Sequence, residues 1–339
     1  ARRPAVGGRM RLRETFAFAF GYQARQAWPW LCFLALAGIT MLMGPQMQGN
    51  SALEQGYFFN APYAVANVTQ VSSLLWLPIA AVVTGSIAAR DFQSRMFALA
   101  CATPTARGDY LAGHFLAALA LNALLALAIP LALLLCLLMP WLQPVLGPFR
   151  PDGYLAAYFL LALPNGLLVT ALAFSFVVLR RKSSMAMPAF GLVLFFSLFG
   201  SQFLAREFGH WELAALLDPM ALTTIIKGTM SWTPLQKSTQ LIGFDGATLA
   251  NRVLWLAASL AVLAFTWRRF RFDQAEGTPR RRLFPARRTR IEGHVEEHFT
   301  PALINAAGCH GLRITGPGTL DGAGRPAPAL AAELFEKTV

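Results

Sequence analysis

The sequence predicts an all-α fold, namely a polytopic membrane protein with six transmembrane helices. Of its 339 residues, 55% are hydrophobic and only 14% are charged, a composition typical of membrane proteins rather than of soluble domains. The apolar residues gather in six long runs, each close to the about 20 residues that an α-helix needs to cross about 30 Å of hydrocarbon. The runs cover residues 27–44, 68–89, 111–138, 154–179, 185–204 and 249–267.

Basic residues lie almost entirely on alternate connections between these runs. The N-terminal segment, the second and fourth connections and the segment after the last run carry clusters of Arg, with Lys182 in the fourth. The first connection, residues 45–67, has no basic residue, and the third has only Arg150. Because Lys and Arg near helix ends resist translocation, this pattern predicts that the N and C termini are both cytoplasmic.

Residues 1–26 are predicted to be a cytoplasmic segment that contains an amphipathic helix. Around residues 12–26, aromatic side chains alternate with arginines. On a helix, Phe16, Phe20 and Gln23 would share one face that is only partly apolar. Such a helix is expected to lie in the membrane interface with its aromatic side inward.

The six-helix transmembrane region, residues 27–267, contains mild polar groups and prolines. Small hydroxyl and amide residues commonly form hydrogen bonds of about 0.6–2 kcal/mol between membrane helices. Packing is therefore their expected role, with a place in a substrate passage as the alternative. These residues are Thr69, Gln70, Ser72, Ser73, Thr84, Asn122, Asn165 and Thr170, and the interrupting prolines are Pro78, Pro130, Pro164 and Pro188.

Ionisable residues are scarce in the six runs. No Asp, Glu or Lys lies inside them, Arg252 is placed at the edge of the sixth, and His114 falls near the start of the third. Ion-coupled transporters keep ionisable groups at membrane depth, where the coupling ion binds. The sequence therefore argues against a carrier that is driven by its own ion gradient.

The long fifth connection, residues 205–248, is predicted to form two short helices at the outer surface. They cover residues 211–217 and 221–226 and are separated by Asp218 and Pro219. Trp211 and Trp232 suit the membrane interface. The segment would either cap a translocation path or form a packed lid.

No nucleotide-hydrolysing site is encoded, so the chain is predicted not to be an enzyme and to hold no cofactor. Such a site needs a glycine-rich loop that ends in Gly-Lys-Ser/Thr. None of the four lysines, Lys182, Lys227, Lys237 and Lys337, follows a glycine. If the protein performs transport, ATP and Mg²⁺ must be bound by a partner subunit.

The second connection is the predicted contact with such a partner. A short helix there would expose Phe92, Met96 and Leu99 on one side, at i, i+4 and i+7. This face suits docking into a groove of a soluble subunit, with lipid as the alternative surface. The predicted contact residues are Arg90, Asp91, Phe92, Arg95, Met96, Leu99, Thr103, Pro104 and Arg107.

The order of these residues, followed by Tyr110-Leu111 and Gly113, resembles the same connection in type-2 ABC exporter permeases. Further segments resemble a bacterial subgroup that is sometimes joined to, or encoded beside, an M1-type zinc aminopeptidase. They are Asn60–Ala66, Gly147–Arg150 with Tyr154 and Tyr158, Leu161–Pro164, Leu217–Pro219, Ser231–Thr233 and Asn251–Leu256. The likeness covers about residues 12–272 and departs at Gln93-Ser94, where such permeases often carry an acidic residue and a glycine.

The resemblance implies a permease subunit of an ATP-driven exporter in the bacterial cytoplasmic (inner) membrane. It implies an ABC ATP-binding subunit against the second connection, a second permease half as homodimer or heterodimer, and a membrane-associated aminopeptidase as a further partner. Nucleic acid is not expected, because the net charge of +12 lies where anionic lipid head groups would be. Without charged residues in the membrane interior, the expected substrate is hydrophobic or amphipathic.

Residues 268–339 are predicted to be a basic cytoplasmic tail that is disordered or aberrant. His294 to His298 match the H-x-x-E-H pattern of some zinc hydrolases, but little chain remains for a third ligand and a surrounding domain. Residues 311–322 resemble one rung of a β-helix, which cannot bury a core alone. The alternative function is a non-transporting membrane scaffold, or a membrane-anchored metallohydrolase component that uses these histidines.

Overall fold

The computed structural model describes residues 6–94, 106–243 and 245–270, with side chains from Leu12 onward. These residues contain no strand, and six of their helices are long and apolar enough to cross a membrane. The spans are Ala27–Gln55, Pro62–Gln93, Arg107–Cys136, Pro151–Arg180, Ser183–Arg206 and Gly246–Arg269. The prediction of an all-α, multi-pass membrane protein is confirmed.

Three spans are continuous helices and three are composite. The continuous ones are α2 (Ala27–Gln55), α3 (Pro62–Gln93) and α14 (Gly246–Arg269). The third span consists of α5 (Arg107–Ala126) and α6 (Ala128–Cys136). The fourth consists of α7 (Pro151–Ala156), the π-helical turn η2 (Ala157–Ala162) and α8 (Leu163–Arg180). The fifth consists of η3 (Ser183–Met185), α9 (Ala186–Phe195), the π-helical turn η4 (Phe196–Gly200) and α10 (Ser201–Arg206).

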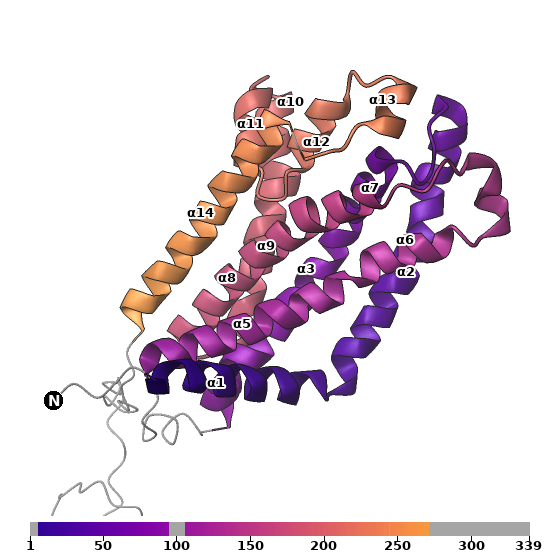
Figure 1. Cartoon of the computed structure of the whole chain (residues 1–339). Coiled ribbons are helices and arrows are strands. Elements are labelled where there is room, and N and C mark those ends of the chain that lie inside the picture. The colour runs from indigo at the N-terminus through magenta and orange to yellow at the C-terminus, as the bar shows by residue number, and fades with distance from the viewer. Residues whose placement is uncertain (1–5, 95–105, 244, 271–339) are drawn as a thin grey trace, which may run out of the picture. The chain divides into compact units, whose positions relative to one another are not determined.

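Shorter helices lie at the two ends of the bundle. The end that carries Arg90, Arg107, Arg180 and Arg269 is called the basic end, and helix α1 (Val6–Ala24) lies there beside the start of α5 (Figure 1). The far end carries η1 (Pro140–Val145), α11 (Trp211–Leu217), α12 (Leu222–Thr229) and α13 (Pro234–Thr239). The two helices predicted in the fifth connection are confirmed as α11 and α12.

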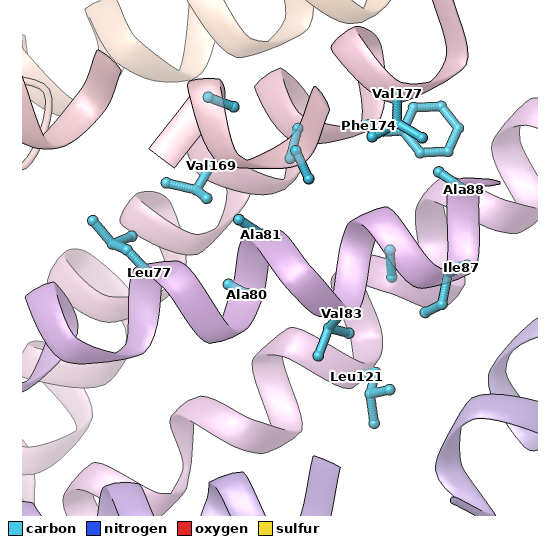
Figure 2. Packing of buried hydrophobic residues seen from close by; sticks show 14 of the residues in the cluster. Leu77, Ala80, Ala81, Val83, Ile87, Ala88, Leu121, Val169, Phe174 and Val177 are labelled. Carbon is cyan, nitrogen blue, oxygen red and sulfur yellow. The ribbon is translucent and has the colours of Figure 1, made fainter. Parts of the chain in front are cut away.

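The core forms around α3, which packs against both α5 and α8. The second, third and fourth spans are central: 61%, 50% and 72% of the most apolar stretch of each is buried inside the protein. The corresponding fraction is 22% in each of the other three spans, which are peripheral. Figure 2 shows Ala80 and Ala81 of α3 between Leu121 of α5 and Val169 of α8. Small side chains let the helix backbones approach closely, which is how membrane helices gain packing energy.

The polar residues of the spans perform the predicted packing role. Asn122 on α5 donates from Nδ2 to the Ala80 carbonyl, to Thr84 Oγ1 at 3.0 Å and to Thr170 Oγ1 at 2.9 Å. Ser72 on α3 accepts a 3.1 Å hydrogen bond from Thr40 on α2. These side chains are fully enclosed by protein, so none of them lines an open passage in this conformation.

Two of the predicted prolines mark breaks in the spans. Pro130 has no amide hydrogen for the carbonyl of Ala126, and α5 ends at Ala126. Pro164 cannot donate to Leu160, and the π-helical turn η2 ends at Ala162, two residues before it. Pro78 lies within the continuous helix α3, and Pro188 falls in the first turn of α9, where no hydrogen bond is lost.

Helix α1 begins at Val6, earlier than predicted, and has the expected orientation toward the bundle. The rings of Phe16 and Phe20 stack with centroids 5.7 Å apart and pack against the core, and Gln23 is buried. Phe18 and Tyr22, on the other side, are 66% and 50% exposed. A Cβ at Gly113 would lie 2.7 Å from Thr15, so α1 contacts α5 without a gap.

Candidate functional site

The basic end holds the described part of the predicted partner contact. Arg90, Asp91 and Phe92 lie in the last turn of α3, and Arg107 is the first residue of α5. Arg95, Met96, Leu99, Thr103 and Pro104 lie outside the described residues. The prediction that the connection itself contacts a partner stays a prediction, while its two ends can be described in detail.

Asp91 joins α3 to α5 through a compact polar cluster. The hydroxyl of Tyr110 donates to Asp91 Oδ2 at 2.9 Å, and Nε of Arg90 donates to Oδ1 at 3.3 Å. His114 Nε2 lies 3.4 Å from Oδ2, and its Nδ1 lies 2.9 Å from the carbonyl of Tyr110 one turn earlier. The carboxylate is only 14% exposed, so these contacts are screened less than a surface ion pair.

Arg90 also ties this cluster to α1. Its guanidinium carbon lies 4.6 Å from the ring centroid of Phe18 and 4.8 Å from that of Tyr22. Both distances are within the range of cation–π attraction. The two most exposed aromatic residues of α1 therefore contact the end of α3, and three helices meet at one arginine.

The turn between α8 and α9 supports α3 from a different side. Gln93 donates from Nε2 to Ser183 Oγ at 2.6 Å, and the Arg181 guanidinium lies 5.7 Å from the Phe92 ring centroid. A Cβ at Gly85 would approach the Ser183 carbonyl to 3.1 Å. Phe92 is consequently half-buried, which corrects the expectation that it is freely exposed with Met96 and Leu99. The reason is that α3 continues to Gln93, so Phe92 belongs to the span rather than to a separate helix.

The start of α5 is fastened to the end of α14. Arg107 Nη1 donates to the carbonyl of Phe270 at 2.9 Å. The rings of Tyr110 and Phe270 are nearly parallel, at 8°, with centroids 6.3 Å apart. A Cβ at Gly108 would lie 2.6 Å from the Trp267 ring, so glycine is needed for this close approach. Both ends of the connection around residues 95–105 are thus held by neighbouring helices.

A second polar cluster lies toward the far end, and it corrects the expectation for Arg252. Arg252 is buried inside the sixth span, with 4% of its surface exposed. Its Nη1 donates to Asn165 Oδ1 at 2.8 Å and its Nη2 to the Met220 carbonyl at 2.9 Å. Gln70 on α3 donates to the same carbonyl. A charged group therefore does lie buried inside a span: Nη1 and Nη2 have protein acceptors, while Nε is buried without a partner among the described residues.

Asp218 organises the segment that Arg252 contacts. Its Oδ1 accepts the amide of Met220 at 3.0 Å and its Oδ2 accepts the amide of Thr223, which fixes the turn into α12. Burial raises the pKa of the Asp218 carboxyl above its ordinary value, and these hydrogen bonds oppose the rise. Asn251 donates to the carbonyls of Ala215, Leu216 and Asp218. The fifth connection is therefore packed on α14, and its predicted role as a cap over a translocation path stays a prediction.

The two polar clusters join helices through hydrogen bonds and charge contacts. Among the described residues, no three His, Cys, Asp or Glu side chains lie close enough to hold a metal ion. The predicted zinc pattern at His294 to His298 and the β-helix-like segment at 311–322 lie outside the described residues. Sequence reasoning did not assign a role to Phe18, Tyr22 or Tyr110, although the four-residue spacing of Tyr110 and His114 places both on one helical face.

In comparisons with known proteins, the chain matches no protein-family model and no curated protein significantly.

Proposed function

We propose that the chain is the transmembrane permease subunit of an ATP-driven type-2 ABC exporter in a bacterial inner membrane. Two permease halves and two ATP-binding subunits would form the transporter, with ATP and Mg²⁺ held by the ATP-binding subunits. The sequence resemblance supports this class, and six membrane-spanning helices provide the architecture that it needs.

The observation that carries the proposal is the fastening of both ends of the connection around residues 95–105. Asp91 and Arg90 join its first end to α5 and α1, and Arg107 joins its second end to α14. A soluble subunit that pushes on such a connection moves several spans together. A loosely tethered loop would absorb the same push by bending, which would transmit no work to the helices.

The peripheral spans provide surface for a second permease half. Three spans are mostly uncovered within the chain, because only 22% of the most apolar stretch of each is buried. They are α2, the span that contains α9 and α10, and α14. The break at Leu127 and the π-helical turns η2 and η4 give the spans points at which rearrangement costs few hydrogen bonds. In the proposed cycle, ATP binding and hydrolysis on the partner alternate these helices between two arrangements.

A hydrophobic or amphipathic substrate fits the interior best. Arg252 is the one charged side chain in the described part of the spans that is buried at membrane depth away from the basic end, and protein acceptors already occupy two of its donor groups. A cationic substrate would find no counter-charge at Arg252, and an anionic one would have to compete with the Asn165 and Met220 oxygens for its guanidinium. An acyl, peptidic or aromatic compound needs no counter-charge.

The direct test is purification of the tagged chain from its native cells in a mild detergent, followed by mass spectrometry of what copurifies. The proposal predicts an ATP-binding-cassette subunit in stoichiometric amount, absent from a control preparation of an unrelated multi-pass protein. A stoichiometric peptidase without any ATPase would instead support the scaffold function. One bound zinc per chain, with hydrolase activity, would support the metallohydrolase.

A further inference from the structure

An apolar groove opens between α5 and α8, with α1 at one end and α14 along its side. Its volume is about 730 Å³. Helix α5 contributes Ala120 and Ala123, and their small side chains leave space that larger residues would fill. The other walls include Leu116 of α5, Phe159 of η2, Leu167 of α8 and Leu256 of α14.

Two features fix the shape of the groove. Pro164 and the π-helical turn η2 distort the wall opposite α5, since their backbone departs from the regular α-helical pattern. Tyr158 of the same turn donates from its hydroxyl to the Ala123 carbonyl at 2.8 Å, which holds the two walls together at the level of Ala123. The groove is therefore built into the packed helices and does not depend on a flexible loop.

The position of the groove determines what can fill it. Its long walls belong to membrane-spanning helices, so the surrounding solvent is hydrocarbon rather than water. An empty apolar space of this size loses dispersion contacts on every wall, and water finds no polar partners there. A flexible hydrocarbon chain from the bilayer restores these contacts.

Charge identifies one end of the groove as a head-group position. Leu12, Arg13 and Phe16 of α1 line that end, and Arg13 is the only charged residue in the lining among the residues whose side chains the structure describes, which begin at Leu12. Within that part of the chain, Arg13 is exposed and forms no ion pair with an acidic side chain. Its neighbour Glu14 does not line the groove. Guanidinium groups bind phosphate oxygens through paired, charge-assisted hydrogen bonds.

We propose that this groove binds one anionic phospholipid, with an acyl chain along the α5 and α8 walls and the phosphate on Arg13. The head group would lie at the basic end, in the leaflet that the positive-inside pattern assigns to the cytoplasm and that is rich in anionic lipid. The site requires only that the chain spans a membrane. It is independent of the proposed transport, so a failure of one leaves the other standing.

The test uses the purified full chain in nanodiscs with equal amounts of phosphatidylglycerol and phosphatidylcholine of identical acyl chains. After release into detergent, native mass spectrometry counts the lipids that stay bound. The wild type should retain one phosphatidylglycerol. Arg13→Gln should lower the preference for phosphatidylglycerol by about two- to fivefold, the effect of losing one solvated ion pair. Arg25→Gln, which removes an exposed charge just after α1 and outside the groove, should match the wild type.

A second pair of variants tests the apolar walls. Ala120→Trp should fill the groove and abolish retention of the lipid, while Ala35→Trp, on the exposed surface of α2, should not. Arg13 is exposed, so its variant remains informative if Ala120→Trp fails to fold. Unchanged head-group preference in Arg13→Gln, or unchanged lipid retention in a folded Ala120→Trp, would overturn the proposal. A lipid-free wild type whose dimer is broken by Ala120→Trp would assign the groove to a second copy and would also overturn it.

Discussion

Arg252 on α14 donates a 2.8 Å hydrogen bond from Nη1 to Oδ1 of Asn165 on α8. The same guanidinium reaches the Met220 carbonyl from Nη2 at 2.9 Å, so one side chain joins two spans and the segment before α12. A buried charge in a membrane span is costly unless acceptors surround it. Two of the three guanidinium nitrogens have acceptors here, so the contact joins α14 to α8 and to the segment before α12.

Replacing Arg252 with Met should destabilise the chain. Asn165 Oδ1 would lose a donor, and a hydrogen bond to a charged group contributes about 1.5–3 kcal/mol. Loss of helical circular dichroism on heating in detergent should occur at lower temperature for Arg252→Met. Arg206→Met, at an exposed position, is the matched control and should melt like the wild type. Equal melting of both variants would show that Arg252 contributes no net stability.

The contact of Gly166 with Trp76 offers a steric test of the α3–α8 packing. A Cβ at Gly166 would lie 2.2 Å from Cη2 of the buried Trp76 ring, which leaves no room for a methyl group. Gly166→Ala should therefore cost about 1–3 kcal/mol through overpacking. Gly191→Ala is the control, because nothing lies within 4 Å of its added Cβ and alanine favours helix. If both variants unfold at the same denaturant concentration, the close α3–α8 contact is wrong.

The spans could be predicted from sequence because hydropathy reports directly on membrane depth. The helix ends could not, because helices continue into water, where the pattern loses its apolar signal. Helix α2 runs past Pro45 to Gln55 although the predicted span stops at residue 44, and its extension is rich in Gln and Asn. Helix α14 begins at Gly246, three residues before the predicted start, which places Arg252 further from the helix end than expected. The burial of Arg252 also depends on Met220, which lies far from it in the sequence.

The polar cluster around Asp91 can be tested with a variant that removes the charge of the side chain and keeps its size. Asp91→Asn keeps the side-chain volume but removes the charge that faces Arg90 and His114, and Tyr110→Phe removes one hydrogen bond worth about 0.5–1.5 kcal/mol. Both variants should insert normally, yet the ATPase activity of the assembled complex should respond less to substrate, more so for Asp91→Asn. Asp152→Asn breaks an ion pair with Arg150 whose carboxylate is 40% exposed, and serves as the control. A full response of the ATPase activity to substrate in Asp91→Asn would show that the polar cluster around Asp91 does not contribute to coupling.

The surroundings of the described residues in the predicted partner contact were only partly predictable. Arg90, Asp91 and Arg107 were predicted as contact residues because charges beside an apolar stripe favour a docking connection. Their partners were not, since Phe18, Tyr22 and Phe270 come from distant segments that only the folded bundle brings together. Local periodicity contains no information about such contacts.

The positive-inside pattern predicts which exposed sites face the outside of the cell. In a chain whose native cysteines are replaced by serine, cysteines at the exposed positions Glu54 and Gln240 should react with an impermeant maleimide on intact cells. A cysteine at Ser184, in the turn after α8, should react only after permeabilisation. Labelling of the Ser184 site on intact cells would reverse the orientation.

We expect the connection between α3 and α5 to dock an ATP-hydrolysing subunit. Met96 lies in its predicted apolar stripe, and complete burial of such a side chain would contribute about 1.5–3 kcal/mol. The decisive measurement is the ATPase activity that copurifies with tagged wild type, Met96→Glu and Arg95→Ala, normalised to correctly inserted chain. Docking through this connection predicts strong copurifying activity for the wild type, a mild loss for Arg95→Ala and near-complete loss for Met96→Glu. Undiminished activity with Met96→Glu, or none with the wild type, would contradict it.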